Sequence, residues 1–466
     1  MDNRSFLANS ARMDASFHLS DGVSAKRALN KSPFSLRTIG SVSEDIFFGN
    51  RAKRIYVAKP EFGIPFLSSS DILQADLSGV KLASKKYTPG VEQMKLEEGW
   101  ILISRSGTIG NTAWTNYSHA QKLASEDVIR VIPNHILRKG FVYAYLSSRF
   151  GHALLTQGTY GTVIQHIEPK QVAAIPIPEF PNDFQDKVDS LIVGASSLRD
   201  EALVLTENAR MRLLKEANLP ALTREDYNYL GPKYAGRALS TFSRSIKDLG
   251  TISFNAFNYS ERVRVNIINR IKAIPHITLK DALDEKNFWS SSGVTVNEVK
   301  EGHGIMLINQ SDIFDRIVKG KYVAMKAKYK KDLLKQGEVL IAKIGTLGEN
   351  ETFCRCVYVG EELEGQLVSS AFYRLTPSVG IPSGYLYAWL SSDYGFRLLR
   401  SSHYGTKQCY PNPLFLNEYP FPVLSTESMN EIDAMIVKAH HLMHLANNKE
   451  REAISMVEKE IEKWNS

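Results

Sequence analysis

The sequence predicts a mixed α/β (α+β) fold of two tandem homologous domains, each followed by a long helix, with the two helices pairing as a coiled coil. Two observations predict this architecture. Blocks of the first half recur in the same order in the second half. Each half also ends in a helical pattern whose apolar residues are separated by alternating steps of four and three residues. The 466 residues suffice for two or three domains with cores of their own.

The repeat is most evident in the closing block of each half. Residues 140–178 align with residues 384–422 at an offset of 244, and 15 of the 39 positions are identical. Apolar runs such as ILIS and VLIA predict strands, and the segments around YAYLSS and YAWLSS predict one or two short helices in each half. Three further blocks align in the same order: 16–23 with 256–263, 65–72 with 306–313, and 99–110 with 337–348.

The long helices set the predicted domain boundaries. The first apolar series runs from Phe184 through Leu198 to Ala209, and Pro220 stops the helix. The second series begins at Ile432, skips Glu450 and then resumes. A helix that packs only on its own domain is the alternative, but the narrow, sustained seam favours pairing. The predicted division is domain 1 at 1–181, a helix at 182–218, a polar connector at 219–255, domain 2 at 256–424 and a helix at 425–466.

The composition is that of a globular protein. Hydrophobic residues make up 43% and charged residues 23% of the chain, and no apolar run approaches the roughly 20 residues of a membrane span. The N-terminus lacks an apolar signal core, and three cysteines cannot form a disulfide framework, so we expect a cytoplasmic protein. The net charge of +7 permits a polyanionic partner without indicating one by itself.

Motifs typical of enzymes and metal sites are incomplete in this chain. GTIGN and GTLGEN follow apolar strands but lack the lysine of a phosphate-binding P-loop. Cys354, Cys356 and Cys409 lack the spacing of a zinc site. NPLF (412–415) resembles the NPPY motif of amino-methyltransferases but lacks its second proline, and the first repeat reads EPKQ there. We therefore expect no catalytic site, metal or cofactor. Four glycines are expected to shape tight turns through positive φ angles: Gly107, Gly110, Gly345 and Gly348.

Basic segments in both halves suggest contacts with nucleic-acid phosphates. Residues 319–335 contain seven lysines and one aspartate, with two tyrosines among them, and residues 50–59 form a second basic stretch. A solvated charged face is the alternative, but in both halves the basic stretch precedes the strand that leads to the GTxG turn. The basic candidates are Arg51, Lys53, Arg54, Lys326 and Lys328.

Sequence choice requires side chains that can bond to base edges. Arg105 and Lys343 occupy equivalent positions before the two GTxG turns. The segments that precede Asp71 and Asp312 keep their frame while their polar side chains differ, as two readers of different half-sequences would, although some of these residues could instead cap turns. The candidates in these segments are Ser68, Ser69, Ser70, Asn309, Gln310 and Ser311.

In their order, these blocks resemble the specificity (S) subunit of bacterial type I restriction–modification systems. The resemblance rests on the doubled series SSSDI/NQSDI, LISRSGTIG/LIAKIGTLG, YAYLSS…YGT…IPIP and long helix, and it covers nearly the full chain. It implies two target-recognition domains that each read half of a split DNA sequence, and two helices that pair antiparallel as a spacer. Carried over by position, it implies further DNA-contacting segments at Thr108, Tyr160, Thr162, Thr346, Tyr404, Thr406 and Lys407.

The resemblance also implies the partners of this chain. They are double-stranded DNA, two DNA methyltransferase (M) subunits and restriction/translocase (R) subunits, with no membrane. S-adenosylmethionine is expected on the methyltransferase, because the S subunit is not a catalyst. Two alternatives stay open: the recognition subunit of a type IIB-like system, whose partner fuses methylation with cleavage, and a sequence-specific DNA-binding protein that works alone.

Overall fold

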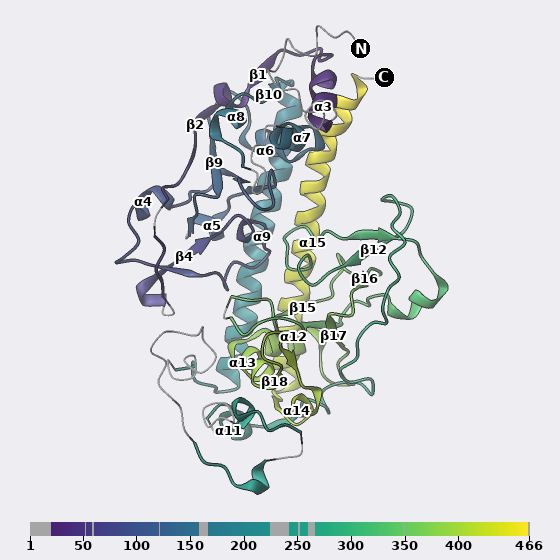
Figure 1. The fold of residues 1–466 in the computed structure, drawn as a ribbon. Coiled ribbons are helices and arrows are strands. Elements are labelled where there is room, and N and C mark those ends of the chain that lie inside the picture. The colour runs from purple at the N-terminus through teal and green to yellow at the C-terminus, as the bar shows by residue number, and fades with distance from the viewer. Residues whose placement is uncertain are drawn as a thin grey trace. The chain divides into compact units, whose positions relative to one another are not determined.

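The chain forms two compact units. The computed structural model describes residues 20–51, 53–57, 60–120, 122–157, 166–223, 242–249, 252–259, 266–348 and 350–464 (Figure 1). The first unit comprises Met1–Asp200 and Leu445–Ser466, and the second comprises Glu201–His444. Each unit therefore includes part of both long helices, whereas the sequence predicts the helices as segments separate from the domains. Residues 224–241 of the predicted connector lie outside the described residues.

The first unit contains two four-stranded sheets, with the strand orders β2–β9–β6–β7 and β3–β5–β4–β8, and a two-stranded ribbon of β1 and β10. Its strands are β1 Leu36–Thr38, β2 Ser43–Phe48, β3 Tyr56–Val57, β4 Gly63–Leu67, β5 Leu82–Ser84, β6 Ile101–Ser104, β7 Thr112–Trp114, β8 Leu123–Ala124, β9 Val128–Pro133 and β10 Pro176–Pro178. Its short helices are α3 Asp21–Leu29, α4 Val91–Met94, α5 Tyr117–Ala120, α6 Lys139–Ser147, α7 Arg149–Gln157 and α8 Pro169–Ala173.

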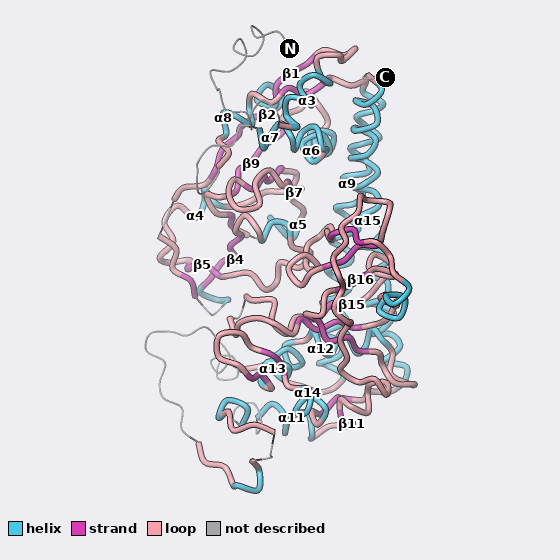
Figure 2. The backbone as a smooth tube through the Cα atoms, turned by 45° about the vertical axis from the view of Figure 1, so that its right-hand side comes forward, coloured by secondary structure: helices cyan, strands magenta, loops and turns pink. Residues whose placement is uncertain are grey.

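The second unit contains two three-stranded sheets, β15–β14–β17 and β13–β12–β16, and two ribbons, β11–β20 and β18–β19. Figure 2 shows that loops make up much of this unit. Its strands are β11 His276–Thr278, β12 Ile305–Ile308, β13 Lys321–Val323, β14 Val339–Ala342, β15 Cys356–Tyr358, β16 Leu367–Val368, β17 Phe372–Leu375, β18 His403–Tyr404, β19 Tyr410–Pro411 and β20 Pro420–Pro422. Its short helices are α11 Ile268–Lys272, α12 Ser383–Ser391, α13 Asp393–Ser401 and α14 Pro413–Asn417.

The two units share the pairings of their central, parallel and closing strands, as two copies of one fold should. Strand β6 lies antiparallel between β7 and β9, and β14 lies antiparallel between β15 and β17. The parallel pair β4–β8 corresponds to β12–β16. The closing strands β10 and β20 pair with β1 and β11. The ILIS and VLIA strands and the short helices α6, α7, α12 and α13 occur where the sequence predicts them.

Each unit approaches a long helix through the same hydrogen bond. The Gly140 N–H donates to Asp189 Oδ1 at 2.7 Å, and the Gly384 N–H donates to Asp433 Oδ1 at 2.6 Å. A Cβ at either glycine would lie 2.9 Å from that aspartate. Glycine at this repeated position therefore lets the short helix lie close against the long one.

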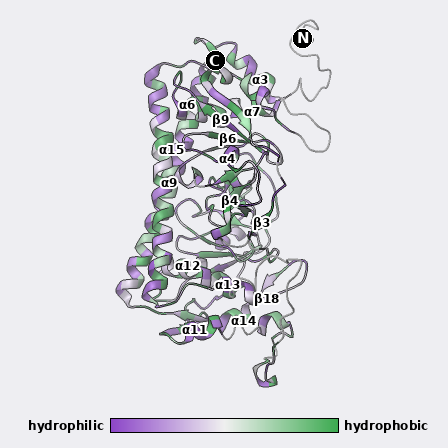
Figure 3. Ribbon diagram, turned by 90° about the vertical axis from the view of Figure 1, so that its left-hand side faces the viewer, coloured by the Kyte–Doolittle hydropathy of each residue, from purple (hydrophilic) through white to green (hydrophobic). Residues whose placement is uncertain are grey.

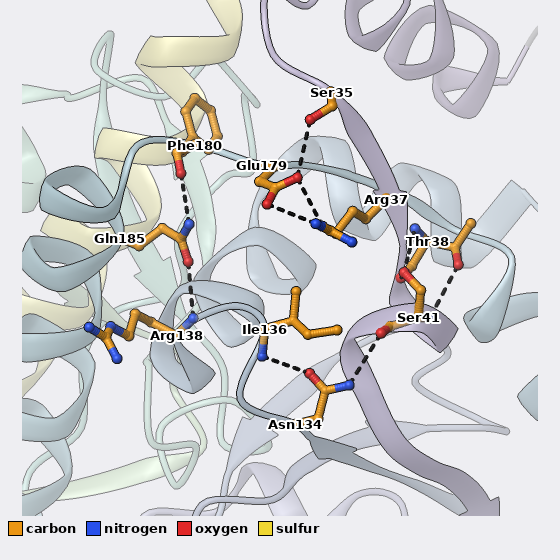
Figure 4. A network of polar contacts seen from close by, with 10 residues as sticks. All are labelled: Ser35, Arg37, Thr38, Ser41, Asn134, Ile136, Arg138, Glu179, Phe180 and Gln185. Atoms are coloured by element: carbon orange, nitrogen blue, oxygen red, sulfur yellow. Dashed lines mark hydrogen bonds and ion pairs between the residues drawn. The ribbon is translucent and has the colours of Figure 1, made fainter.

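Polar contacts also fix the closing strand of the first unit (Figure 4). Glu179 accepts two hydrogen bonds from the Arg37 guanidinium, at 2.9 and 3.0 Å. The Gln185 side chain donates to the Phe180 carbonyl at 2.7 Å and accepts from the Arg138 N–H at 3.0 Å. Gln185 thus links the start of the long helix to the start of α6.

The long helices, α9 Asn182–Glu216 and α15 Thr426–Lys463, pair in antiparallel fashion. In the second unit Lys438 bonds with Glu201 at 2.8 Å and Arg212 pairs with Glu431, so residue numbers rise along one helix as they fall along the other. Figure 3 shows hydrophobic and hydrophilic residues alternating along both helices. In the first unit one hydrophobic cluster includes buried residues of both helices: Val188, Ile192, Ala453, Val457 and Ile461.

The seam contains a buried ion pair that the sequence pattern does not show. The pattern places Leu198 at the seam, but Leu198 is only partly buried and Arg199 is 5% exposed. The Arg199 guanidinium bonds with Glu450 at 2.6 Å and with Asn447 at 2.9 Å. The Tyr143 hydroxyl also donates to Glu450, at 2.5 Å. At Glu450, where the apolar pattern of the second helix is interrupted, the seam therefore contains an ion pair in place of an apolar residue.

Acid is expected to weaken the second unit through His440 of α15. The imidazole lies 4.8 Å from the Tyr358 ring and 5.4 Å from the Tyr387 ring, and desolvation, with a smaller effect of Arg210, lowers its pKa to about 4. The unfolded chain therefore binds a proton that the folded chain excludes as pH falls from about 6.5 to 4. We expect the free energy of unfolding to decrease by about 2 kcal/mol between pH 7 and pH 5 because of this residue.

Urea unfolding of the parent and the His440→Gln variant at both pH values measures this contribution. The variant should show a smaller loss at pH 5. An identical pH dependence in the two proteins would contradict the assignment.

Candidate nucleic-acid interface

Three segments of the second unit that are distant in the sequence meet at the GTLG turn. The Gln310 side chain donates to the Ile344 carbonyl at 2.6 Å and accepts from the Ile344 N–H at 3.3 Å. Across the turn, Gly345 and Cys409 exchange backbone hydrogen bonds of 3.3 and 2.7 Å. The NQS segment, the GTLG turn and the hairpin of β18 and β19, which carries the YGT sequence and is called the YGT hairpin below, therefore form one continuous surface. We call it the GTLG surface (residues 309–311, 343–348 and 404–408).

A buried arginine holds the GTLG turn through hydrogen bonds to the carbonyl groups of the turn. Arg400 Nη2 donates to the Gly348 carbonyl at 2.8 Å and to the Thr346 carbonyl at 3.5 Å. The residue is fully buried on α13 and its guanidinium lies 4.7 Å from the Phe396 ring centroid. With the turn held by these bonds, its exposed side chains have a fixed backbone beneath them.

The exposed side chains of the GTLG surface are mostly hydrogen-bonding groups. Tyr404 is 47% exposed, and its ring stacks on Tyr410 at 5.6 Å. Gln310 has both ends of its amide bonded to Ile344, so it positions the turn and offers less to a ligand than the sequence suggests. The other predicted residues here are exposed: Asn309, Ser311, Thr346, Thr406 and Lys407.

Lys343 lies at the edge of this surface and is partly buried. Its ammonium donates to Ser290 Oγ at 2.8 Å and lies 5.0 Å from the Tyr373 ring centroid. Burial lowers the pKa of the Lys343 ammonium. Tyr373 donates in turn to the Pro411 carbonyl at 3.3 Å, which connects this cation to the YGT hairpin.

The lysine-rich segment of the same unit includes a 3₁₀ helix, Ala327–Asp332. Lys328 is exposed and Lys326 partly so, and their ammonium groups lie 5.2 and 6.0 Å from the centroid of the Tyr329 ring. Tyr329 is buried and holds the segment against the unit, while the lysines remain in solvent. Exposed lysines on a segment that is held in place by a buried tyrosine are suited to contacts with phosphates.

The first unit places Arg105 differently from the prediction. Arg105 is 3% exposed, and its guanidinium bonds with Glu168 at 2.5 Å and with the Ile167 carbonyl at 3.1 Å. It also lies 4.6 Å from the centroid of the Phe48 ring. A guanidinium enclosed in this way is not presented to a base edge, so we assign Arg105 a structural role.

The serine segment of the first unit is largely a turn. Asp71 Oδ2 accepts from the Ser68 N–H at 2.7 Å and from its hydroxyl at 2.6 Å, and Ser70 Oγ lies 3.1 Å from Ser68 Oγ. Ser69 Oγ lies 3.8 Å from where a Cβ on Gly107 would be, so this segment and the GTIG turn are adjacent, as in the second unit.

The basic candidates of the first unit differ in exposure. Arg51 and Lys53 are exposed, whereas Arg54 pairs with Glu126 and lies over the Phe66 ring at 5.1 Å. Thr108 is exposed at the GTIG turn. Two further predicted residues, Tyr160 and Thr162, lie outside the described residues.

The turn glycines fulfil the prediction in one repeat only. Gly107 and Gly110 have φ angles of 75° and 79°, which confirms positive φ in the first unit. Gly345 and Gly348 do not adopt it. A Cβ on Gly345 would lie 2.9 Å from Phe353 Cβ, and one on Gly348 would lie 2.7 Å from Glu351 Cγ. In the second unit glycine is therefore needed for close approach rather than for backbone conformation.

Several residues of this site are missed by sequence reasoning. Ser290 and Tyr410 carry no signal, since neither lies in a motif. Tyr373 could have been found, because alternation along β17 buries Phe372 and Arg374 and turns Tyr373 to the other face. The buried arginines are also missed, because charged residues on a strand are usually assumed to be exposed.

No cluster of metal ligands and no membrane helix occurs in the described part of the chain. Among these residues, no three His, Cys, Asp or Glu side chains are arranged to hold a metal ion. None of the described helices is long and apolar enough to cross a membrane. Burial raises the pKa of the Cys354 thiol well above its usual value, which disfavours the thiolate that binds metals.

One family model matches part of the first unit. Residues 38–191 match the family model described as "Type I restriction modification DNA specificity domain". No curated protein matches the chain.

Three solved structures that resemble the chain come from type I restriction–modification systems or are HsdS subunits. One is the type I restriction–modification system S subunit from M. genitalium, with 14% identity, coverage of 92% of this chain and 96% of that chain, and a TM-score of 0.36. The HsdS subunit from Thermoanaerobacter tengcongensis has 13% identity, coverage of 91% and 96%, and a TM-score of 0.29. The third, from work on complex assembly and conformational transition of the type I R-M system, has 12% identity, coverage of 93% and 97%, and a TM-score of 0.28.

Proposed function

We propose that the chain is the DNA specificity subunit of a type I restriction–modification complex, because residues 38–191 match the family model of the type I restriction modification DNA specificity domain. Its two units each read one half of a bipartite DNA target. The observation that carries the proposal is the second unit, which repeats the strand pairings of the matched unit with different polar residues on the equivalent surface.

The proposed complex assigns catalysis to the partners. Methyltransferase subunits supply S-adenosylmethionine chemistry, and restriction subunits supply cleavage. The long helices α9 and α15 suit a spacer, since the buried Arg199–Glu450 pair ties them to each other. This chain then contributes sequence choice, for which two polar surfaces backed by rigid turns are sufficient.

Purification of the full chain together with a methyltransferase subunit of its own organism tests the proposal. The complex, given S-adenosylmethionine and a randomised duplex library, should methylate only duplexes with two fixed half-sites at a constant spacing. The methyltransferase without this chain is the control and should show no such choice. Methylation without sequence preference by the complete complex would contradict the proposal, and a partner that also cleaves would indicate a type IIB-like system.

A further inference from the structure

We propose that the β18–β19 hairpin is the element of the second unit that enters the major groove, with Thr406, Lys407 and Gln408 reading base edges. This inference rests on the proposed function and names the residues that carry it out in one unit. The hairpin consists of β18 and β19 joined by a four-residue exposed tip, Gly405–Gln408, followed by buried Cys409. It lies next to α13 and α14 (Figure 1).

The base of the hairpin is fixed by groups from another part of the unit. Asn258 Nδ2 donates to the His403 carbonyl at 3.0 Å and to the Ser401 carbonyl at 2.7 Å. The His403 ring is 5% exposed and packs edge-on against Phe257 at 4.4 Å. The strands therefore leave the unit in a defined direction, and little conformational freedom has to be lost when the tip binds.

The tip itself is narrow and constrained. Gly405 has a φ of 93°, and a Cβ there would lie 2.2 Å from the Gln408 carbonyl oxygen. The backbone of Cys409 is bonded to Gly345 of the GTLG turn. Tyr404 and Tyr410 are cross-strand partners whose rings stack at an interplanar angle of 24°, an arrangement that stabilises two-stranded ribbons.

The exposed chemistry of the tip matches base edges better than phosphates. The Lys407 cation is suited to guanine and the Gln408 amide to adenine, while the Thr406 hydroxyl can bond to either of these bases. The Tyr410 hydroxyl donates to Gln408 Oε1 at 3.2 Å and so restricts the amide. Phosphate binding usually uses several cations, and the tip has only one. The lysines of residues 319–335 are better suited to bind phosphates. The major groove admits a two-stranded ribbon of this kind.

The methylation assay on a randomised library, run with the full complex, tests the hairpin. We expect Lys407→Ala and Gln408→Ala each to relax base choice about tenfold or more at one or two positions of a single half-site. The other half-site should keep its choice. Lys330→Ala, which removes an exposed lysine of the 319–335 segment, is the matched control and should weaken all sequences evenly with a smaller salt dependence.

The outcomes separate this inference from the proposed function. If the parent complex selects a bipartite sequence and both tip variants keep every base preference, the hairpin is not the reader and the inference is wrong while the proposed function stands. If the parent complex selects no sequence, both are overturned. Unchanged melting temperatures of the tip variants would show that loss of choice does not come from unfolding, which the exposure of residues 406–408 leads us to expect.

Discussion

Arg374→Leu is expected to destabilise the second unit by about 3–5 kcal/mol, because it leaves a carboxylate buried without its partner. The Arg374 guanidinium forms two hydrogen bonds of 2.7 Å with Glu338, and both side chains are at most 5% exposed. It also donates to Ser291 and to the carbonyls of Asp332 and Leu333, and it lies 4.1 Å from the Trp289 ring. The substitution therefore removes the group that joins β14, β17 and the end of the lysine-rich segment.

Hydrogen exchange under increasing denaturant measures this loss unit by unit. Amides of β14 and β17 should lose protection in Arg374→Leu while those of the first unit keep it. Arg37→Ala is the matched control, since it removes a two-bond pair with Glu179 whose side chains are 38% and 34% exposed. It should cost far less stability than Arg374→Leu, because solvent screens an exposed ion pair. Equal losses in the two variants would show that the burial of the Arg374 pair has no special effect.

Glu450→Leu is expected to destabilise the helix seam of the first unit by about 3–5 kcal/mol, because it leaves the buried Arg199 guanidinium without its carboxylate. The side chains of Arg199 and Glu450 are 7% and 2% exposed. Asn447 and Tyr143, which bond to this pair, cannot replace the lost negative charge. Denaturant unfolding followed by helical circular dichroism measures the change.

A second substitution distinguishes charge from shape at this position. Arg199→Leu in the Glu450→Leu background should recover most of the lost stability, since an apolar pair of similar volume fits a seam. Lys438→Ala, which removes an exposed pair with Glu201 on the same helices, should cost less than about 1 kcal/mol. If the double variant were as unstable as Glu450→Leu, packing rather than the unpaired charge would explain the loss.

The periodic parts of the fold could be predicted from the sequence because burial there follows a simple repeat. Strands β6 and β14 are continuous apolar runs, and the long helices carry a seam at steps of four and three residues. The doubled order of blocks then required two units of one kind. None of these features depends on which distant residue contacts which, so a local sequence pattern is enough to predict them.

The candidate site was predictable only in outline, because exposure of a polar residue depends on its partners. Arg105 and Lys343 are equivalent in the alignment, yet one is enclosed with Glu168 and the other is partly buried against Tyr373. The sequence predicts Gln310 as a residue that contacts bases, but both ends of its side-chain amide are hydrogen-bonded to the backbone of Ile344. These partners lie 30 to 63 residues away in the sequence, so no local sequence pattern indicates them.

Arg130 and Arg374 lie at the same repeated position, at an offset of 244, but their surroundings limit how parts of this protein can be exchanged. Arg130 bonds to the carbonyls of Ser125, Val128, Ala124 and Met94, and position 100, the counterpart of Glu338, is a tryptophan. A graft of residues 100–104 into the second unit would place tryptophan where Glu338 stands and leave the buried Arg374 without its acid. Recombined versions of this chain should therefore keep their folds best when a whole unit is transferred, because each buried arginine then keeps its own partners.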